Sequence, residues 1–378
     1  MKRLLPHTVL PARIKAAATA GEDYAVTDPP DWREIDWAEH LHRIEVDGRE
    51  VNYVDIGEQG DHRPMVFVHG LSGQWQNWLE NIPRFAEARR VLALDLPGFG
   101  YSEMPRERIS IEVYGRLLVE FLEQLELGHV VLVGNSMGGF VAAEVAIRRP
   151  ELVDRLMLLA SAGVSQMDIA QRPIRAGGKW LTLLIKSNAA QQRHVARRPT
   201  LRHLVLAVVA RHPSRLKADM AFEGLIKGTG KPGFEDALRA CLEYDFRDRL
   251  PQIDCPTLVL WGEKDAIIPV KDADKFVELI DGARKIVMED TGHLPMVERP
   301  TTFNEALEGF LHHKTSDGEL EGEVKEPDPL RGGRYSADGE FEPDSDSDAE
   351  GESDPGANGE PAAESESEVG RAPEPAAG

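Results

Sequence analysis

Cysteine is scarce in this sequence, which has only Cys241 and Cys255 among 378 residues. One disulfide between them stays open as an alternative. With only two cysteines, two free thiols in a reducing compartment are the better interpretation. We treat both residues as structural.

Long apolar runs are also lacking. The chain starts with Met1, Lys2 and Arg3, which resemble the basic start of a signal peptide, but Pro6 and His7 interrupt the apolar stretch. A signal peptide needs an apolar run of about 7–15 residues, and a membrane-spanning helix needs about 20. We therefore expect a cytoplasmic protein, with a weakly surface-associating N-terminal arm as the alternative.

The chain has no excess of basic residues, and its net charge is −21. Residues 315–378 hold 20 Asp and Glu against 4 Lys and Arg, so this tail supplies most of the charge. Nothing in this balance predicts a nucleic-acid partner. The tail also has very few apolar side chains to offset the entropy lost on ordering, which predicts a disordered acidic segment.

Short apolar runs alternate with helical patterns over most of the remaining chain. A hairpin is expected at residues 41–57, and further strands are expected at 65–68, 91–94, 130–133, 156–159, 257–261 and 285–288. Helices are expected at residues 75–85, 111–125, 140–149, 271–280 and 301–313. This alternation predicts an α/β fold with one doubly wound, mostly parallel sheet of eight strands.

Residues 164–250 interrupt that alternation, because they show helical periodicity without a convincing strand. We expect a helical cap there. The predicted organisation is an N-terminal arm (1–40), docked by Trp32 and Trp37, an α/β core (41–163 and 251–314), the cap (164–250) and the acidic tail (315–378).

The organising motif is residues 130–139, with the sequence VVLVGNSMGG. Its apolar start predicts a buried parallel strand, and a helical pattern follows it. Gly134 and Gly138 flank Ser136 because the turn leaves no room for a Cβ on either side. Ser136 is therefore expected at the tip of a sharp strand-to-helix turn, with its hydroxyl exposed. An ordinary strand–loop–helix junction is the alternative.

A serine nucleophile needs a base, and the base needs an orienting acid. Asp265 and His293 follow the strands at 257–261 and 285–288, so both are expected near Ser136 at the carboxyl edge of the sheet. Glu263 is the nearest competitor for the acid. The alternative roles are a turn-capping aspartate and a surface-loop histidine.

A tetrahedral oxyanion needs two preorganised donors. By position, we expect the backbone N–H groups of Met137 and of Leu71, which lies in the loop that starts at His69-Gly70. His69 is expected to prop this loop through its ring nitrogens rather than to act as a base. Asp95 is expected to shape the neighbouring loop.

Patterns for metals and dinucleotides are missing. No His, Cys and Asp spacing indicates a metal site, and Gly98-Phe99-Gly100 is too short for a dinucleotide fingerprint. We therefore expect neither a metal nor a cofactor.

Five motifs carry a family resemblance: His69-Gly70, residues 95–102 (DLPGFGYS), 134–139 (GNSMGG), 261–265 (WGEKD) and Gly292-His293. Over roughly residues 40–313 the sequence resembles the α/β-hydrolase superfamily, in which the triad follows the chain order serine, acid, histidine. The resemblance implies that Ser136 attacks, His293 moves the proton and Asp265 orients His293. Haloalkane dehalogenases and epoxide hydrolases on this fold use an aspartate nucleophile, so Ser136 argues against them.

The substrate is less well indicated. Asn135 and the pair Trp75 and Trp78 resemble carbon–carbon bond hydrolases of ring-fission products, which usually carry an aromatic residue soon after the catalytic histidine. Here Leu294 follows His293. Bacterial esterases and monoacylglycerol lipases share the Gly-Asn-Ser pattern. We expect a serine hydrolase that cleaves a lipophilic carboxylic ester. Carbon–carbon bond cleavage is the alternative, and a non-catalytic small-molecule-binding relative is the alternative from another class.

The cap is both basic and apolar. Residues 166–217 hold 11 Lys and Arg against one acid, Asp168, and apolar clusters lie at 180–185 and 201–209. These clusters either pack only on each other and the core or line a tunnel for an acyl or aromatic group. The basic face is either solvated or weakly attracts anionic lipid, an anionic substrate or the acidic tail. The oligomeric state stays open.

Overall fold

The computed structural model describes residues 23–162, 189–312, 333–335 and 341–343. Within the predicted tail this covers only the antiparallel pair β9 (Gly333–Tyr335) and β10 (Phe341–Pro343). The rest of the tail prediction lies outside the described residues.

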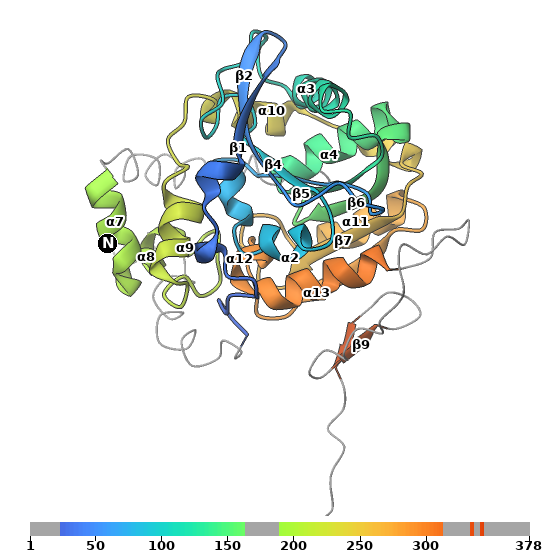
Figure 1. The fold of residues 1–378 in the computed structure, drawn as a ribbon. Helices are drawn as coiled ribbons and strands as arrows, with labels where there is room; N and C mark the ends of the chain where they lie inside the picture. Colours follow the sequence, from blue (N-terminus) through green and yellow to red (C-terminus); the bar gives the residue numbers. More distant parts are fainter. Residues whose placement is uncertain (1–22, 163–188, 313–332, 336–340, 344–378) are drawn as a thin grey trace, which may run out of the picture. The chain divides into compact units, whose positions relative to one another are not determined.

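One eight-stranded sheet forms the centre of the fold (Figure 1). Its strands, in chain order, are β1 (Leu41–Val46), β2 (Arg49–Ile56), β3 (Met65–Val68), β4 (Val91–Leu94), β5 (Val130–Asn135), β6 (Val153–Leu159), β7 (Thr257–Gly262) and β8 (Arg284–Met288). Their spatial order is β1-β2-β4-β3-β5-β6-β7-β8. Strand β2 is antiparallel to both of its neighbours, and every other pair is parallel. The predicted fold class is confirmed.

The hairpin that opens the sheet forms where the sequence predicts it. Asp47 and Gly48 both have positive φ values, 50° and 65°. Two positive φ values match the twist of a tight hairpin turn, and Asp-Gly is a preferred pair for that turn.

Successive side chains of the central strands point to opposite faces of the sheet. In β5, Val130 and Leu132 join one buried cluster, whereas Val131 and Val133 join another. Helices cover both faces, which explains why these strands are apolar without alternation. Burying each such side chain stabilises the fold by about 1.5–3 kcal/mol.

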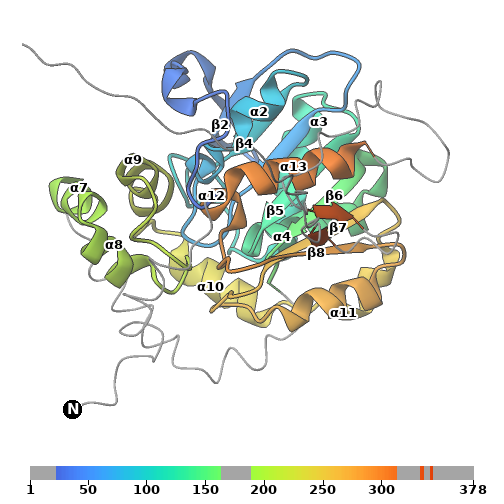
Figure 2. The same cartoon turned by 90° about the horizontal axis from the view of Figure 1, so that it is seen from below.

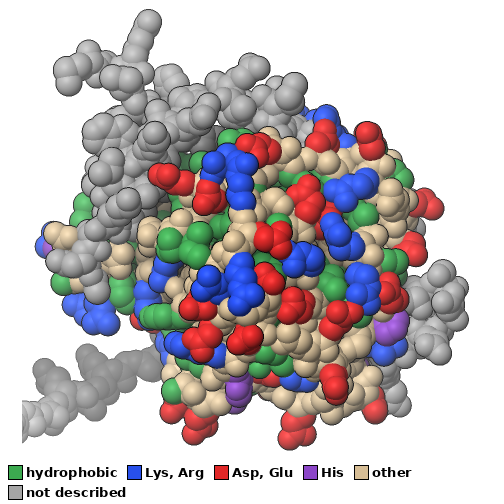
Figure 3. Space-filling model, turned by 90° about the horizontal axis from the view of Figure 1, so that it is seen from above, with side chains coloured by type: hydrophobic (Ala, Val, Ile, Leu, Met, Phe, Trp, Pro, Cys, Tyr) green, Lys and Arg blue, Asp and Glu red, His purple; other side chains and the backbone are tan. Residues whose placement is uncertain are grey.

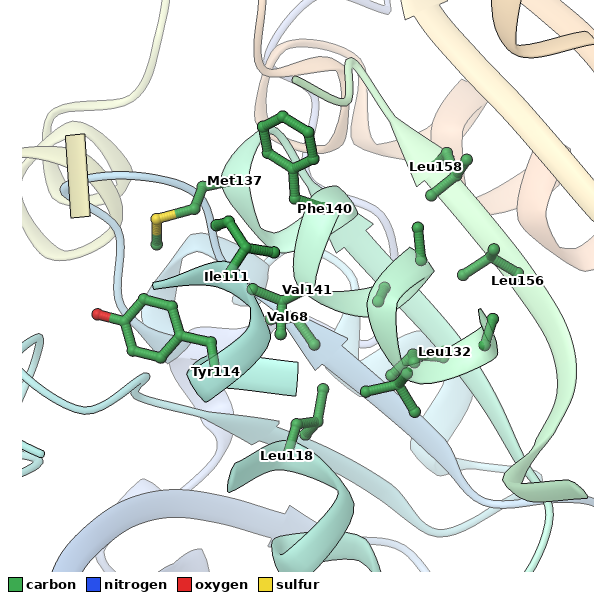
Figure 4. Packing of buried hydrophobic residues seen from close by; sticks show 14 of the residues in the cluster. Val68, Ile111, Tyr114, Leu118, Leu132, Met137, Phe140, Val141, Leu156 and Leu158 are labelled. Carbon is green, nitrogen blue, oxygen red and sulfur yellow. The ribbon is translucent and has the colours of Figure 1, made fainter. Parts of the chain in front are cut away.

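The longer described helices are α3 (Ile111–Gln124), α4 (Met137–Arg148), α7 (Ala189–Arg197), α8 (Pro199–Leu206), α10 (Phe234–Glu243), α11 (Lys271–Leu279) and α13 (Pro300–Leu311). Helices α3, α4 and α11 lie on one face of the sheet, and α2 (Ile82–Ala86) and α13 lie on the other (Figures 1 and 2). Figure 4 shows the first face, where Tyr114, Leu132, Phe140 and Leu158 belong to one buried cluster.

The shorter described helices are η1 (Trp32–Glu34), η2 (Trp37–His40), η3 (Trp75–Trp78), η4 (Pro150–Leu152), α9 (Ala218–Met220), the π-helix η5 (Ala221–Ile226), η6 (Arg247–Gln252) and α12 (Pro295–Glu298). The single helix predicted at residues 75–85 is wrong, because η3 and α2 are separate. Pro83 has no N–H group to continue a helix that starts at Trp75. The helix after the motif starts at Met137 rather than Phe140, and α12 was not predicted.

Residues 23–40 lie against the core through Trp32 and Trp37. The Trp32 indole donates to Glu80 Oε1 (3.0 Å), and the Trp37 ring lies 5.1 Å from the Trp75 ring between centroids. Tyr24 is also buried.

The described part of the cap is helical, and no strand occurs in residues 189–250. Helices α7, α8 and α9 lie together at one side of the sheet (Figures 1 and 2). Helix α10 instead contacts α3 on the core. The predicted cluster at residues 180–185 lies outside the described residues.

Cysteine, surface charge and helix hydrophobicity can each be described for the residues that the structure covers. Both cysteines are free thiols, and burial raises the pKa of each to about 12, consistent with structural residues. Basic and acidic side chains are interspersed on the face shown in Figure 3. No helix in the described residues is long and apolar enough to cross a membrane.

Candidate active site

Ser136 lies at the turn between β5 and α4, with φ 55° and ψ −116°. It is the single residue between the strand, which ends at Asn135, and the helix, which begins at Met137. A non-glycine residue with positive φ is strained by about 1–3 kcal/mol, and such strain persists only where the surroundings hold it. The sharp turn predicted at this serine is present.

Close backbone approach explains the glycines beside Ser136. A Cβ on Gly134 would lie 2.3 Å from the Gly138 carbonyl oxygen, and a Cβ on Gly138 would lie 2.2 Å from the Val68 carbonyl oxygen. A Cβ at either position would push β3, β5 and α4 apart. These two glycines therefore let the serine turn sit directly against the end of β3.

Asp265 and His293 lie in contact at the ends of β7 and β8. His293 Nδ1 is 2.7 Å from Asp265 Oδ2, and both side chains are almost fully buried. Asp265 Oδ1 accepts hydrogen bonds from the N–H groups of Ile267 (2.8 Å) and Ile268 (2.9 Å). A carboxylate only accepts, so Nδ1 carries the proton and Nε2 is left with its lone pair. This is the tautomer that a general base requires.

The histidine loop (residues 289–294) and the serine turn are joined by a side chain. Asn135 Nδ2 donates to the Leu159 carbonyl (3.1 Å) and to the His293 carbonyl (3.4 Å). Because Asn135 directly precedes Ser136, this contact brings the predicted nucleophile and the predicted base to the same edge of the sheet.

The oxyanion loop (residues 69–73) lies beside the serine. A Cβ on Gly70 would be 3.0 Å from Ser136 Cβ. The Gly70 carbonyl accepts from the Gly73 N–H (2.9 Å) and from His69 Nδ1 (2.7 Å), which fixes the Gly70–Leu71 peptide. In a trans peptide the N–H points away from the C=O, so these bonds also fix the direction of the Leu71 N–H.

Met137 supplies the other predicted donor. It is the first residue of α4, and the first N–H groups of a helix have no partner within the helix. The helix dipole adds positive potential at the same point. Both predicted donors are thus backbone groups that the fold holds near Ser136.

A model of the α/β-hydrolase fold family matches residues 63–300, which include all of these elements. The chain belongs to the α/β-hydrolase fold family. This agrees with the resemblance stated from the motifs.

The relatives of this hydrolase carry different named activities. It is 32% identical over 278 residues to the dihydrolipoyllysine-residue acetyltransferase component of the acetoin cleaving system of Pseudomonas putida, covering 71% of this chain and 68% of that protein. It is 31% identical over 272 residues to 2-hydroxymuconate semialdehyde hydrolase of Pseudomonas sp. strain CF600, covering 68% and 89%.

Among solved structures, the hydrolase is similar to a membrane phospholipase A described as a bacterial virulence factor. The identity is 28%, the TM-score is 0.57, and the match covers 72% of this chain and 85% of that one. Together, the family and the relatives support hydrolase activity on small molecules without selecting one substrate.

His69 props the oxyanion loop through both ring nitrogens. Its Nδ1 donates to the Gly70 carbonyl, and its Nε2 accepts the Leu96 N–H (2.9 Å). Burial lowers the pKa of His69 to about 4, so the ring is neutral at working pH. Both nitrogens are engaged, as expected for a supporting rather than a basic role.

Asp95 holds the neighbouring loop, as predicted. Its carboxylate accepts from the Trp75 N–H (2.8 Å), the Tyr101 N–H (2.9 Å) and the Asn52 amide (2.9 Å). Burial raises the pKa of Asp95 to about 6 despite these donors.

Glu263, the competing acid, is placed differently from Asp265. It is exposed, pairs with Lys264 and accepts the Asp290 N–H (3.1 Å). The contact to His293 is made by Asp265.

Sequence reasoning missed Glu298. This carboxylate is fully buried and accepts the N–H groups of Gly292 (3.0 Å) and Leu294 (3.1 Å), on both sides of His293. In the sequence, Glu298 is a single acidic residue directly after the apolar residues 294–297. This pattern alone does not predict that the carboxylate is buried.

Several hydrogen bonds join the cap to the core near the site. The His293 N–H donates to the Val209 carbonyl (3.1 Å), and the Gln74 amide donates to the Glu223 carbonyl in η5 (2.7 Å). Within the apolar cluster at 201–209, Leu204 and Val208 are 55% and 42% exposed, so only part of that cluster packs inward.

A cavity of about 740 Å³ lies between the arm, β1, η3 and η5. Its lining residues include Trp32, Trp37 and Trp75, but neither Ser136 nor His293. The predicted acyl tunnel over Ser136 therefore stays a prediction. No group of three His, Cys, Asp or Glu side chains able to hold a metal occurs in the part of the chain that the structure describes.

Proposed function

We propose that this hydrolase is a serine esterase that cleaves a carboxylic ester with a lipophilic acyl or alcohol group. The observation that carries the proposal is the His293–Asp265 pair at 2.7 Å, with Asp265 anchored by two backbone N–H groups. This pair leaves His293 Nε2 as a proton acceptor at the edge where Ser136 sits on its strained turn.

In the proposed reaction, Ser136 Oγ attacks the ester carbonyl carbon while His293 Nε2 takes the serine proton. The carbonyl oxygen becomes an oxyanion, which the Leu71 and Met137 N–H groups bind. The C–O bond to the alcohol then breaks, and His293 returns the proton to the leaving oxygen. Water then attacks the acyl carbonyl carbon while His293 Nε2 takes its proton. The bond from that carbon to Ser136 Oγ breaks, His293 returns the proton to Oγ, and the acid leaves. Only groups of the chain and water take part in these steps.

The oxyanion donors must be fixed before the reaction, and the hydrogen bonds within the oxyanion loop serve this purpose. A donor that is fixed before reaction stabilises the developing charge without reorganising, and losing one typically reduces the rate about 10²–10³-fold. The hydrogen bonds of His69 and Gly73 to the Gly70 carbonyl support this role for Leu71.

The nucleophile can be tested directly. Replacing Ser136 by Ala should lower kcat about 10⁶-fold if the three residues act as a unit. A fluorophosphonate probe should label the wild-type protein at Ser136 and leave Ser136→Ala unlabelled, as read by peptide mass spectrometry. An unlabelled wild-type protein would contradict serine chemistry and favour a non-catalytic relative.

The second candidate is hydrolysis of a carbon–carbon bond in a ring-fission product. The 31% identity to 2-hydroxymuconate semialdehyde hydrolase favours it, whereas Leu294 and Pro295 after His293 depart from the aromatic pattern of that class. A panel of p-nitrophenyl esters from C2 to C16, assayed beside a ring-fission dienone, separates the two. Faster turnover of the dienone would replace the ester proposal.

The lipophilic preference is supported by the similarity to a membrane phospholipase A and by the cap. Residues 189–217 hold seven Lys and Arg and no Asp or Glu, beside the exposed Leu204 and Val208. A weak attraction to anionic lipid surfaces through this basic cap forms part of the proposal, as does a cytoplasmic location.

A further inference from the structure

The buried Glu298 carboxylate joins three separate segments of the chain. Its Oε1 accepts the N–H groups of Gly292 (3.0 Å) and Leu294 (3.1 Å) in the histidine loop. Its Oε2 accepts the Tyr24 hydroxyl (2.7 Å) from the arm and the Arg211 N–H (2.7 Å) from the cap. Each of these partners donates, so Glu298 uses both oxygens as acceptors, which suits a carboxylate.

The backbone around His293 is therefore fixed at consecutive positions. The N–H groups of Gly292 and Leu294 donate to Glu298, and the N–H of His293 itself donates to the Val209 carbonyl (3.1 Å). With three neighbouring N–H groups engaged, this peptide segment cannot rotate without breaking a buried hydrogen bond. Such a loss leaves an unpaired group at about 1–3 kcal/mol each.

The Tyr24 hydroxyl joins the arm to both Glu298 and the cap, because it makes two hydrogen bonds. The hydroxyl donates to Glu298 and accepts the His212 N–H (2.8 Å), and the Tyr24 ring meets the His212 ring edge-on at 5.0 Å. His212 in turn contacts Asp290 of the histidine loop (2.6 Å). Tyr24 is 3% exposed, so these bonds are made away from water.

The arm is held firmly at this point. The Ala25 N–H donates to the Glu298 carbonyl (2.7 Å), and Asp23 accepts from Thr302 (2.8 Å) and from Arg299. Residue 24 also lies outside the stretch 63–300 that matches the hydrolase family. The arm therefore brings to Glu298 a contact from outside the matched stretch.

We propose that Tyr24 and Glu298 are positioning residues for His293, so that the N-terminal arm sets the turnover rate of the hydrolase. Tyr24 holds the Glu298 carboxylate, and Glu298 holds the peptides on both sides of His293. Cap residues 209–212 are bonded into the same arrangement, which joins cap placement to the base. This inference rests on the proposed function of Ser136, Asp265 and His293.

The test compares two arm variants that each remove one hydrogen bond to a buried glutamate. Tyr24→Phe removes the bond to Glu298 and the acceptor of the His212 N–H, and Trp32→Phe removes the bond from the arm to Glu80 (3.0 Å). With the best p-nitrophenyl ester, Tyr24→Phe should lower kcat about tenfold with KM within twofold, because a small displacement of a catalytic group reduces the rate steeply. Trp32→Phe should keep the wild-type kcat. The melting temperature of each variant, measured beside kcat, separates lost stability from lost turnover.

Two results would overturn the proposal. One is a wild-type kcat in Tyr24→Phe, and the other is an equal fall of kcat in both variants, which would show a general effect of arm docking. Fluorophosphonate labelling separates this failure from failure of the proposed function. Labelling of Ser136 in the wild type, with an equal labelling rate in Tyr24→Phe, contradicts only the positioning role.

Discussion

The two halves of the candidate active site are held in different ways. The serine turn and the oxyanion loop are held by neighbouring elements: Gly134 and Gly138 permit close backbone contact, and His69 bonds the adjacent residue and one 27 positions away. The histidine loop is held through Glu298, whose partners lie 87 and 274 positions away, and through the His293 carbonyl, whose partner lies 158 positions away. Local chemistry builds the nucleophile side, whereas tertiary contacts build the base side.

The two sides should differ in how they respond to substitutions elsewhere in the chain. A turn fixed by glycines and a strand end is part of the sheet itself, so it forms whenever the sheet forms. A loop fixed by the arm and the cap depends on segments that lie outside the sheet. We therefore expect the serine side to be rigid and the histidine side to respond to changes made far away.

The largest effect should come from the contact within the histidine side. In Asp265→Asn only one oxygen remains to accept the Ile267 and Ile268 N–H groups and the His293 Nδ1 proton. The amide either disturbs the turn or imposes the wrong tautomer on His293, and kcat should fall about 10⁴-fold, as in serine proteases. Steady-state kinetics on a p-nitrophenyl ester measures this fall.

Glu263→Gln on the same loop is the matched control and should stay within twofold of the wild-type kcat. If Asp265→Asn keeps kcat within tenfold of the wild type, Asp265 is not the orienting acid.

The serine side can be probed through pH. The ordinary pKa of histidine is about 6.5, and burial lowers the pKa of His69 to about 4. As pH falls from about 6.5 to about 4, His69 becomes protonated in the unfolded chain but stays neutral in the folded protein. The free energy of unfolding should therefore decrease by about 3 kcal/mol from this group over that window and be fully retained above it.

Urea unfolding at pH 7 and pH 4.5 checks this expectation. His69→Gln should show a shallower loss of stability toward acid than the wild type, while the exposed His129→Gln should follow the wild-type curve. Parallel curves for wild type and His69→Gln would show that His69 does not titrate with folding.

The sequence predicted the serine side more completely than the histidine side. The apolar strands, the hairpin at Asp47-Gly48 and the glycine turn around Ser136 depend on local propensity and spacing, and each is present. The predicted helix at 75–85 is wrong, because the chain divides there into η3 and α2, with Pro83 in the first turn of α2.

Glu298 and Tyr24 could not be found in the same way. Nothing in the residues near Glu298 indicates that its partners are a tyrosine 274 positions earlier and a cap peptide 87 positions earlier. Such contacts depend on how the arm and the cap pack, which periodicity does not report. Asn135 resembles a substrate marker in sequence, whereas its amide contacts two backbone carbonyls.

Asn135 is where the two sides meet, and it offers the smallest but most specific test. Its amide donates to the Leu159 carbonyl on the serine side (3.1 Å) and to the His293 carbonyl on the other (3.4 Å). In Asn135→Ala the free energy of unfolding should fall by about 1 kcal/mol, the usual net value of a buried hydrogen bond. kcat should fall severalfold with KM unchanged, because only the relative placement of Ser136 and His293 is loosened.

Thr257→Val is the matched control, since it removes one buried hydrogen bond to a carbonyl, that of Cys255 (3.0 Å), at the opposite end of a central strand. Both variants should lose similar stability in urea unfolding, but only Asn135→Ala should lose kcat. If the two variants lose kcat equally, the rate follows global stability, and the link between the two sides does not contribute to turnover. If Asn135→Ala alone slows turnover, the local and the tertiary halves of the site are coupled through this one amide.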